Sequence, residues 1–232
     1  FERGKINVSS AGTMLSFMEK PNFKMSIGFA QYSAEGNLCG DTIKTINDSR
    51  GHMIFIISDG MGKGSRAALD GAMGAGLLSK LLSAGFGFDS SLKVVNSALL
   101  VKSHEESLAT LDCIRVDLFS GKCEFYKAGA PKSYVVKENS LTKCELTSMP
   151  AGILRGVEFA KRTTLLNTDD EIIMMSDGIT DVGDDWLEEF LKLETSFDPN
   201  EKAKAILRLA LENSDEKHRD DMSVIVAKMI EK

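Results

Sequence analysis

The stretch from His52 to Ser65 constrains the fold most, because an apolar segment runs directly into an aspartate and a glycine-rich loop. Residues 53–57 are all apolar, which predicts a strand buried on both faces. Asp59 comes just after this run, and three of the next five residues are glycine, which lets the main chain pass close to a ligand. Because a carboxylate repels a bare phosphate, the stretch indicates a divalent cation between the two.

Further aspartates occupy similar places along the chain. A second apolar run ending in Ser-Asp-Gly leads to Asp177, 118 positions after Asp59. Asp41 lies near the end of another expected strand, and Asp220 and Asp221 precede the last one. Successive side chains of an extended chain point to opposite faces, so only one of these last two can share a site with the others.

Carboxylates gathered at strand ends repel one another and raise each other's pKa. Divalent cations remove this penalty, and oxygen-rich sites suit Mg²⁺ or Mn²⁺. Two such ions can bridge a water, lower its pKa and clamp a phosphoryl oxygen for in-line attack. The aspartates therefore predict a metal site that acts on phosphate esters.

The same aspartates and glycines also occur in other kinds of site. Asp59 or Asp177, taken alone, also fits an aspartate that caps the following helix. Residues 62–67 match the dinucleotide pattern Gly-x-Gly-x-x-Ala, but the surroundings favour antiparallel pairing over a parallel βαβ unit. A Walker-type phosphate loop is excluded because glycine, not serine or threonine, follows the lysine at position 63.

The spacing of strands and turns predicts an α+β fold. Short strands joined by glycine-containing turns favour antiparallel sheets. The expected strands span residues 25–29, 38–46, 53–57, 109–118, 123–128, 133–137, 159–166, 171–176 and 224–229, and the expected helices span 65–82, 91–103, 186–193 and 199–213. Asp198 is expected to cap the last helix, and Asp184 with Asp185 to form a solvated acidic loop. Residues 1–21 are expected to be a linker or upstream remnant, with an early strand as the alternative, and residues 22–232 to form one domain.

Composition excludes several other classes. The chain has 232 residues and a formal net charge of −6, which argues against a general nucleic-acid binder. Its four cysteines show no Cys-x-x-Cys spacing and are expected to be free, buried thiols. No apolar run is long enough to span a bilayer, and no signal peptide is recognisable.

Taken together, the motifs resemble a known family. They are Asp41, Ser58-Asp59-Gly60-Met61-Gly62-Lys63-Gly64, Ser176-Asp177-Gly178-Ile179-Thr180-Asp181 and Arg219-Asp220-Asp221-Met222-Ser223. In this order and spacing they are similar to the PPM family of metal-dependent serine/threonine protein phosphatases, most of all to its bacterial sporulation branch. The resemblance extends over residues 22–230. It implies a four-layer α/β/β/α sandwich, in which two mainly antiparallel β-sheets are flanked by helices and a two-metal centre lies at one end.

The resemblance also implies a role for each motif residue. Asp59 matches the carboxylate that bridges the two ions, and Gly60 matches a ligand that acts through its main-chain carbonyl. Asp177 and Asp220 match the other ligands of the second ion, and Asp41 matches the acid near the first. Asp59, Asp177 and Asp220 would then act in catalysis through a metal-bound water.

Some family features have no clear counterpart in this sequence. The phosphate-gripping arginine of larger members is missing before Asp41, so Lys63 and Arg66 are the candidates for that task. The general acid is unassigned. The helix after Gly64 resembles a switch element of such proteins.

The expected activity is hydrolysis of phosphoserine or phosphothreonine on a protein, with two Mn²⁺ or Mg²⁺ ions and a metal-bridging hydroxide as nucleophile. The alternative is a catalytically weak regulatory module that keeps the fold and binds a partner. The resemblance implies a phosphorylated anti-anti-sigma factor as substrate and regulation by an upstream region of the same chain. A homodimer is left open. The domain is expected to be cytoplasmic, within a parent protein whose membrane anchor lies outside this chain.

Overall fold

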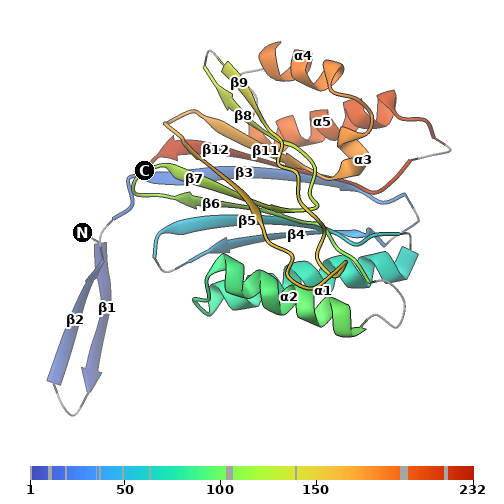
Figure 1. Cartoon of the computed structure of the whole chain (residues 1–232). Helices are drawn as coiled ribbons and strands as arrows, with labels where there is room; N and C mark the ends of the chain where they lie inside the picture. Colours follow the sequence, from blue (N-terminus) through green and yellow to red (C-terminus); the bar gives the residue numbers. More distant parts are fainter. Residues whose placement is uncertain are drawn as a thin grey trace.

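The computed structural model describes residues 2–9, 12–18, 20–34, 36, 38–48, 50–62, 64–102, 107–138, 140–193, 198–216 and 219–232. Two five-stranded antiparallel sheets pack face to face, and helices cover both outer faces (Figure 1). This arrangement confirms the expected α+β, four-layer sandwich.

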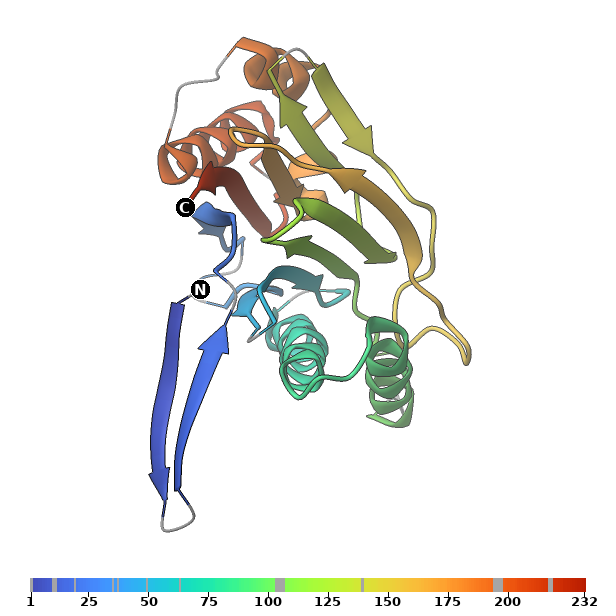
Figure 2. The same cartoon turned by 90° about the vertical axis from the view of Figure 1, so that its left-hand side faces the viewer.

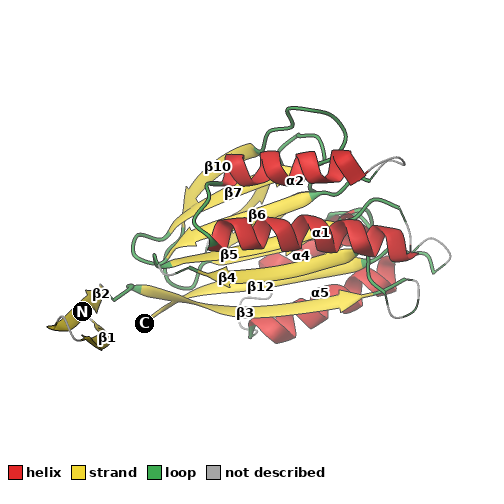
Figure 3. Cartoon of the chain, turned by 90° about the horizontal axis from the view of Figure 1, so that it is seen from below, coloured by secondary structure: helices red, strands yellow, loops and turns green. Residues whose placement is uncertain are grey.

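The first sheet carries the strand that ends in Asp59. Its strand order is β10 (Ala160–Leu165), β7 (Lys122–Ala128), β6 (Leu111–Asp117), β5 (His52–Asp59) and β4 (Asp41–Asn47). Two helices, α1 (Gly64–Ser83) and α2 (Phe88–Lys102), cover its outer face (Figure 3). The second sheet has the order β3 (Phe23–Tyr32), β12 (Met222–Glu231), β11 (Glu171–Met175), β8 (Ser133–Lys137) and β9 (Ser140–Cys144). Its outer face packs against α3 (Asp177–Thr180), α4 (Asp185–Leu193) and α5 (Pro199–Asn213).

Three apolar layers hold the sandwich together. The middle layer lies between the sheets and includes Phe55, Ile114 and Ile225, all at most 1% exposed. A second layer joins the first sheet to α1 and α2, and a third joins the second sheet to α3, α4 and α5. Alternate side chains of residues 53–57 pack into two of these layers, the middle one and the one below α1 and α2. This explains why the segment is apolar throughout.

Most elements agree with the sequence-based expectations. Asp198 caps α5 as expected: its carboxylate accepts a hydrogen bond of 2.9 Å from the Asn200 N–H, and Pro199 begins the helix. Helix α2 starts three residues before the expected position 91. Strand β9 and the short helix α3 were not expected, because neither has a periodic apolar pattern long enough to recognise.

Residues near the N-terminus form a hairpin of β1 (Glu2–Ser9) and β2 (Gly12–Met18), which pair antiparallel in a two-stranded sheet of their own. The hairpin projects away from the sandwich (Figure 2). Strands within residues 1–21 agree with the alternative of an early strand. The domain boundary at residue 22 stays a prediction.

The cysteines and the helices agree with two further expectations. All four cysteines are free, and three of them are buried in strands. Cys39 is only half-buried and lies before β4, outside any strand. No helix in the described ranges is long and apolar enough to cross a membrane.

Helix α5 approaches β3 so closely that Gly28 has no room for a side chain. A Cβ atom built on Gly28 would lie 2.2 Å from main-chain atoms of Pro199 and Asn200. We expect Gly28→Ala to lower the free energy of unfolding by about 1–3 kcal/mol, because α5 must move away. Thermal unfolding followed by circular dichroism measures this, with a fall in Tm of roughly 2–12 °C. Gly76→Ala is the matched control, since nothing lies within 4 Å of its Cβ position. It should stabilise by about 0.4–1 kcal/mol, and equal effects of the two variants would contradict the contact.

Candidate metal centre

The register of β4 against β5 brings two of the expected aspartates together. Asp41 pairs directly with Asp59 at one end of the two strands. Directly paired residues project to the same face of a sheet, and the next pair on that face, Ile43 and Ile57, packs between the sheets. Both carboxylates therefore lie at the edge of the space between the two sheets.

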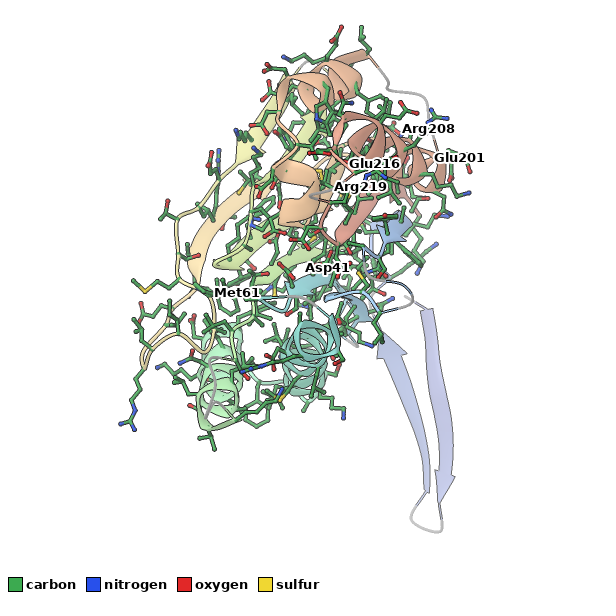
Figure 4. The ribbon with its side chains drawn as sticks, turned by 90° about the vertical axis from the view of Figure 1, so that its right-hand side faces the viewer. Asp41, Met61, Glu201, Arg208, Glu216 and Arg219 are labelled. Atoms are coloured by element: carbon green, nitrogen blue, oxygen red, sulfur yellow. The ribbon has the colours of Figure 1, made fainter. Side chains whose placement is uncertain are left out.

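Asp41 is buried without a compensating partner. It is 5% exposed, and neither carboxylate oxygen accepts a hydrogen bond from the described residues. Burial raises the pKa of Asp41 to about 7, and the carboxylates of Asp177 and Asp221 add to the rise. The nearby hydroxyls of Ser223 and Ser176 offset part of it. Figure 4 shows Asp41 well inside the molecule, between the layer of α1 and that of α5.

Asp59 and Asp177 share this environment. Burial raises the pKa of Asp59 to about 8. Three neighbouring carboxylates raise it further, namely Asp177, Asp41 and Asp220. Burial also raises the pKa of Asp177, with Asp181 and Asp220 adding to the rise. Because burial and the neighbouring carboxylates raise the pKa of all three groups, the carboxylates that the sequence singled out form one electrostatic cluster.

Glycines allow helix α1 to pack directly on this end of the sheet. A Cβ on Gly60 would lie 1.9 Å from the Ala67 carbonyl oxygen, and one on Gly71 would lie 2.3 Å from the Gly40 oxygen. On the other side of the centre, a Cβ on Gly178 would lie 2.1 Å from the Asp221 oxygen. The small residues of α1 therefore serve close packing against the strand ends that carry the aspartates.

Asp220 and Asp221 have different roles, as their positions in an extended segment predict. The Asp221 Oδ1 atom accepts a hydrogen bond of 2.8 Å from the Ala34 N–H, and its Oδ2 accepts one from the Gly40 N–H. Asp221 thus fixes the loop that leads into Asp41. Asp220 is exposed, and its charge contributes to the raised pKa values of Asp59 and Asp177.

Polar residues inside and outside the motifs orient this end of the sandwich. The Asp59 N–H donates to Thr110 Oγ1 (3.1 Å), and the Ser223 N–H donates to Ser176 Oγ (2.9 Å). Gln31 Nε2 donates to Ser223 Oγ at 2.9 Å. The serine that precedes the aspartate in each Ser-Asp-Gly motif could have been recognised from the sequence as a residue that orients the aspartate. Gln31 and Thr110 lie in no motif and could not.

The structure describes one of the two basic candidates, Arg66. Arg66 is exposed in the first turn of α1, and Lys63 lies outside the described residues. Arg219, beside Asp220, is held by the end of α5, because it donates to the Leu211 carbonyl (2.8 Å) and to the Ser214 hydroxyl.

The expectation of a solvated acidic loop at Asp184 and Asp185 is wrong for Asp184. Its carboxylate forms ion pairs with Lys132 and, at 2.6 Å, with Lys143. Although partial burial acts to raise the pKa of Asp184, hydrogen bonds from these two lysines lower it overall. Asp184 therefore ties α4 to β8 and β9. No local pattern indicates these ion pairs, because both lysines are more than 40 positions away along the chain.

The donors at this edge fit a hard divalent cation in their chemistry. All are oxygens, and the two Asp41 oxygens are buried without a hydrogen bond. Within the described part of the chain, however, no three acidic, cysteine or histidine side chains are close enough to hold an ion between them. Ion binding would therefore require the carboxylates to come closer together than they are here. The assignment of individual ligands stays a prediction.

Comparison with known proteins gives the family. Residues 49–230 match the family described as stage II sporulation protein E. The chain belongs to this family. It is 28% identical over 222 residues to stage II sporulation protein E of Bacillus subtilis (strain 168), an alignment that covers 93% of this chain and 27% of that protein. The chain therefore spans about a quarter of the length of this relative.

Solved structures agree on the fold. A structure of the PP2C phosphatase domain with a fragment of the regulatory domain of SpoIIE from Bacillus subtilis is 26% identical, with a TM-score of 0.85. The alignment covers 100% of this chain and 69% of that one. The catalytic domain of the serine/threonine protein phosphatase PstP, in complex with two manganese ions, is 18% identical, with a TM-score of 0.70 over 90% of this chain and 100% of that one. The predicted class, a PP2C-type serine/threonine phosphatase domain, is thereby confirmed at the level of family and fold.

Proposed function

We propose that this domain hydrolyses phosphoserine or phosphothreonine on a protein substrate with the help of two divalent ions, Mn²⁺ or Mg²⁺. The observation that carries the proposal is the cluster of buried Asp41 with half-buried Asp59 and Asp177, whose raised pKa values mark a site built for positive charge. The shared fold of the PstP domain with two manganese ions supports the choice of metal.

The ligands in this proposal are those expected from the sequence. Asp59 would bind both ions, and Gly60 would contribute its main-chain carbonyl. Asp177 and Asp220 would be the further ligands of the second ion, and Asp41 would lie beside the first. Bound divalent ions supply Lewis acidity and a water of lowered pKa. The protein's own part is to supply the carboxylates, and ion binding would release the protons that Asp41 and Asp59 otherwise retain. The nucleophile expected from the sequence remains part of this proposal.

The substrate and partners are proposed from the family. Membership of the stage II sporulation protein E family supports a phosphorylated protein of the anti-anti-sigma factor type as substrate. The similar SpoIIE structure contains a regulatory fragment together with the phosphatase domain, which supports control by an upstream region of the same chain. A homodimer remains compatible with this control, and a cytoplasmic location would give the domain access to such a substrate.

Removal of the metal tests the function. Phosphate release from a phosphoserine-containing protein should be strong with Mn²⁺, should fall to the background rate with a chelator, and should return when Mn²⁺ is restored. The reason is that the ions would supply the positive charge that attracts the phosphate group and the water of lowered pKa that attacks it. Release that persists in excess chelator would contradict metal dependence. Absence of release under every metal condition would instead favour the regulatory module.

A further inference from the structure

A cavity lies at the end of the first sheet that is remote from the carboxylates. Its volume is about 410 Å³, and the turn between β4 and β5 and the turn between α1 and α2 form much of its lining. His52, the first residue of β5, lines it, whereas Asp59 is the last residue of the same strand. Seven residues of extended chain span roughly 23 Å, so this cavity is separate from the candidate metal centre.

Two arginines reach the same wall of the cavity, Arg50 from the β4–β5 turn and Arg115 from strand β6. The position of a Cβ atom on Gly85 lies 3.2 Å from Arg50 Nη2, which places the guanidinium of Arg50 directly against the α1–α2 turn. The guanidinium of Arg115 lies over the ring of Phe88, 5.6 Å from its centroid. Both groups therefore converge on the four residues from Gly85 to Phe88, all of which line the cavity.

The acidic groups near these arginines already have partners. Asp48 accepts hydrogen bonds from the Arg50 and His52 main-chain N–H groups, and it lies 3.0 Å from the His52 ring. Glu124 binds both Arg115 and Lys122. Among the described residues, the guanidinium of Arg50 has no hydrogen bond or ion pair. The cavity thus presents an unsatisfied positive group on a protein whose net charge is −6.

We propose that this cavity binds a phosphate-type anion, either free or as the phosphoryl group of a small metabolite. Guanidinium groups offer several N–H donors in a fixed plane, which match the oxygens of phosphate better than an ammonium does. A volume of about 410 Å³ lies within the usual range of small-molecule sites. Phe86, 54% exposed on the α1–α2 turn, adds an apolar surface beside the basic groups that a flat organic group can cover.

Binding can be measured apart from catalysis. Inorganic phosphate and a nucleoside monophosphate are titrated separately into the metal-free protein, with chelator present so that the carboxylate edge repels both. Amide NMR resonances of His52, Gly85 and Gly87 should shift and saturate. Arg50→Gln should weaken the affinity at least about 10-fold, the loss expected for one charge-assisted hydrogen bond. Arg50 is exposed, so this variant should keep the fold.

Lys44→Gln is the matched control, because it removes the same charge from an exposed position on β4 that does not line the cavity. It should leave the affinity unchanged. The proposal is overturned by equal affinities of wild type and Arg50→Gln, by equal losses in both variants, or by shifts confined to residues around Asp59. Tighter binding of the nucleoside monophosphate than of phosphate supports a metabolite as the source, and equal binding supports the free anion.

Discussion

Asp59→Asn is expected to lower metal-dependent phosphate release at least about 100-fold. In the proposed site Asp59 contacts both ions, and it is the residue on which the charges of Asp177, Asp41 and Asp220 converge. Changes in groups that merely support a metal ligand typically cost 10–100-fold in affinity or activity, so loss of a ligand should cost more. The measurement is the initial rate of phosphate release from a phosphoserine protein at several Mn²⁺ concentrations.

A matched variant separates this effect from general damage. Asp89→Asn makes the same chemical change in the first turn of α2, where the carboxylate is exposed and pairs with Lys161 at 2.7 Å. Its activity should equal that of wild type. Asp59→Asn should remain folded, because the substitution removes a half-buried carboxylate whose charge is unfavourable without metal. Equal release by wild type and Asp59→Asn would refute the assigned role of Asp59 in catalysis.

The central part of the site could be predicted from the sequence because it depends on local rules. An apolar run that ends at Asp59 must be a buried strand, and a second such run ends at Asp177. The fold then needs only antiparallel pairing to place Asp41 opposite Asp59, and β4 and β5 have that register. The glycine-rich start of α1 was also informative, since close packing at Gly60 and Gly71 excludes larger residues.

Features that depend on long-range contacts were not predictable in this way. Asp184 looked like a solvent-exposed acid because its partners Lys132 and Lys143 come from other strands. Gln31 reaches Ser223, 192 positions away, and although Ser223 belongs to a motif, no local pattern marks Gln31. Sequence periodicity reports which face of an element is buried, but it does not report what lies on the far side of that face.

The stability of the metal-free protein should fall as the pH rises from 5 to 8.5. Burial raises the pKa of Asp41 to about 7 and that of Asp59 to about 8, whereas the ordinary value is 3.8. Between these values the folded state binds more protons than the unfolded state, so the free energy of unfolding decreases with pH. The pH range starts at 5 so that other carboxylates do not contribute to the change. Above pH 5 the acids with lowered pKa values are ionised in the folded and in the unfolded state, namely Asp48, Asp117, Glu124 and Asp184. We expect Tm to drop by at least about 5 °C, given about 2–4 °C per kcal/mol for a domain of this size.

Two comparisons assign this drop to the candidate metal centre. The double variant Asp41→Asn, Asp59→Asn has no proton to lose at these positions, so its Tm should change much less over the same pH range. In the wild type, Mn²⁺ should raise Tm more at pH 8.5 than at pH 5, because at the lower pH protons compete with the ion for the same carboxylates. A drop of equal size in the double variant would place the titrating groups elsewhere. A Mn²⁺ effect independent of pH would mean that the ion binds without displacing the protons of Asp41 and Asp59.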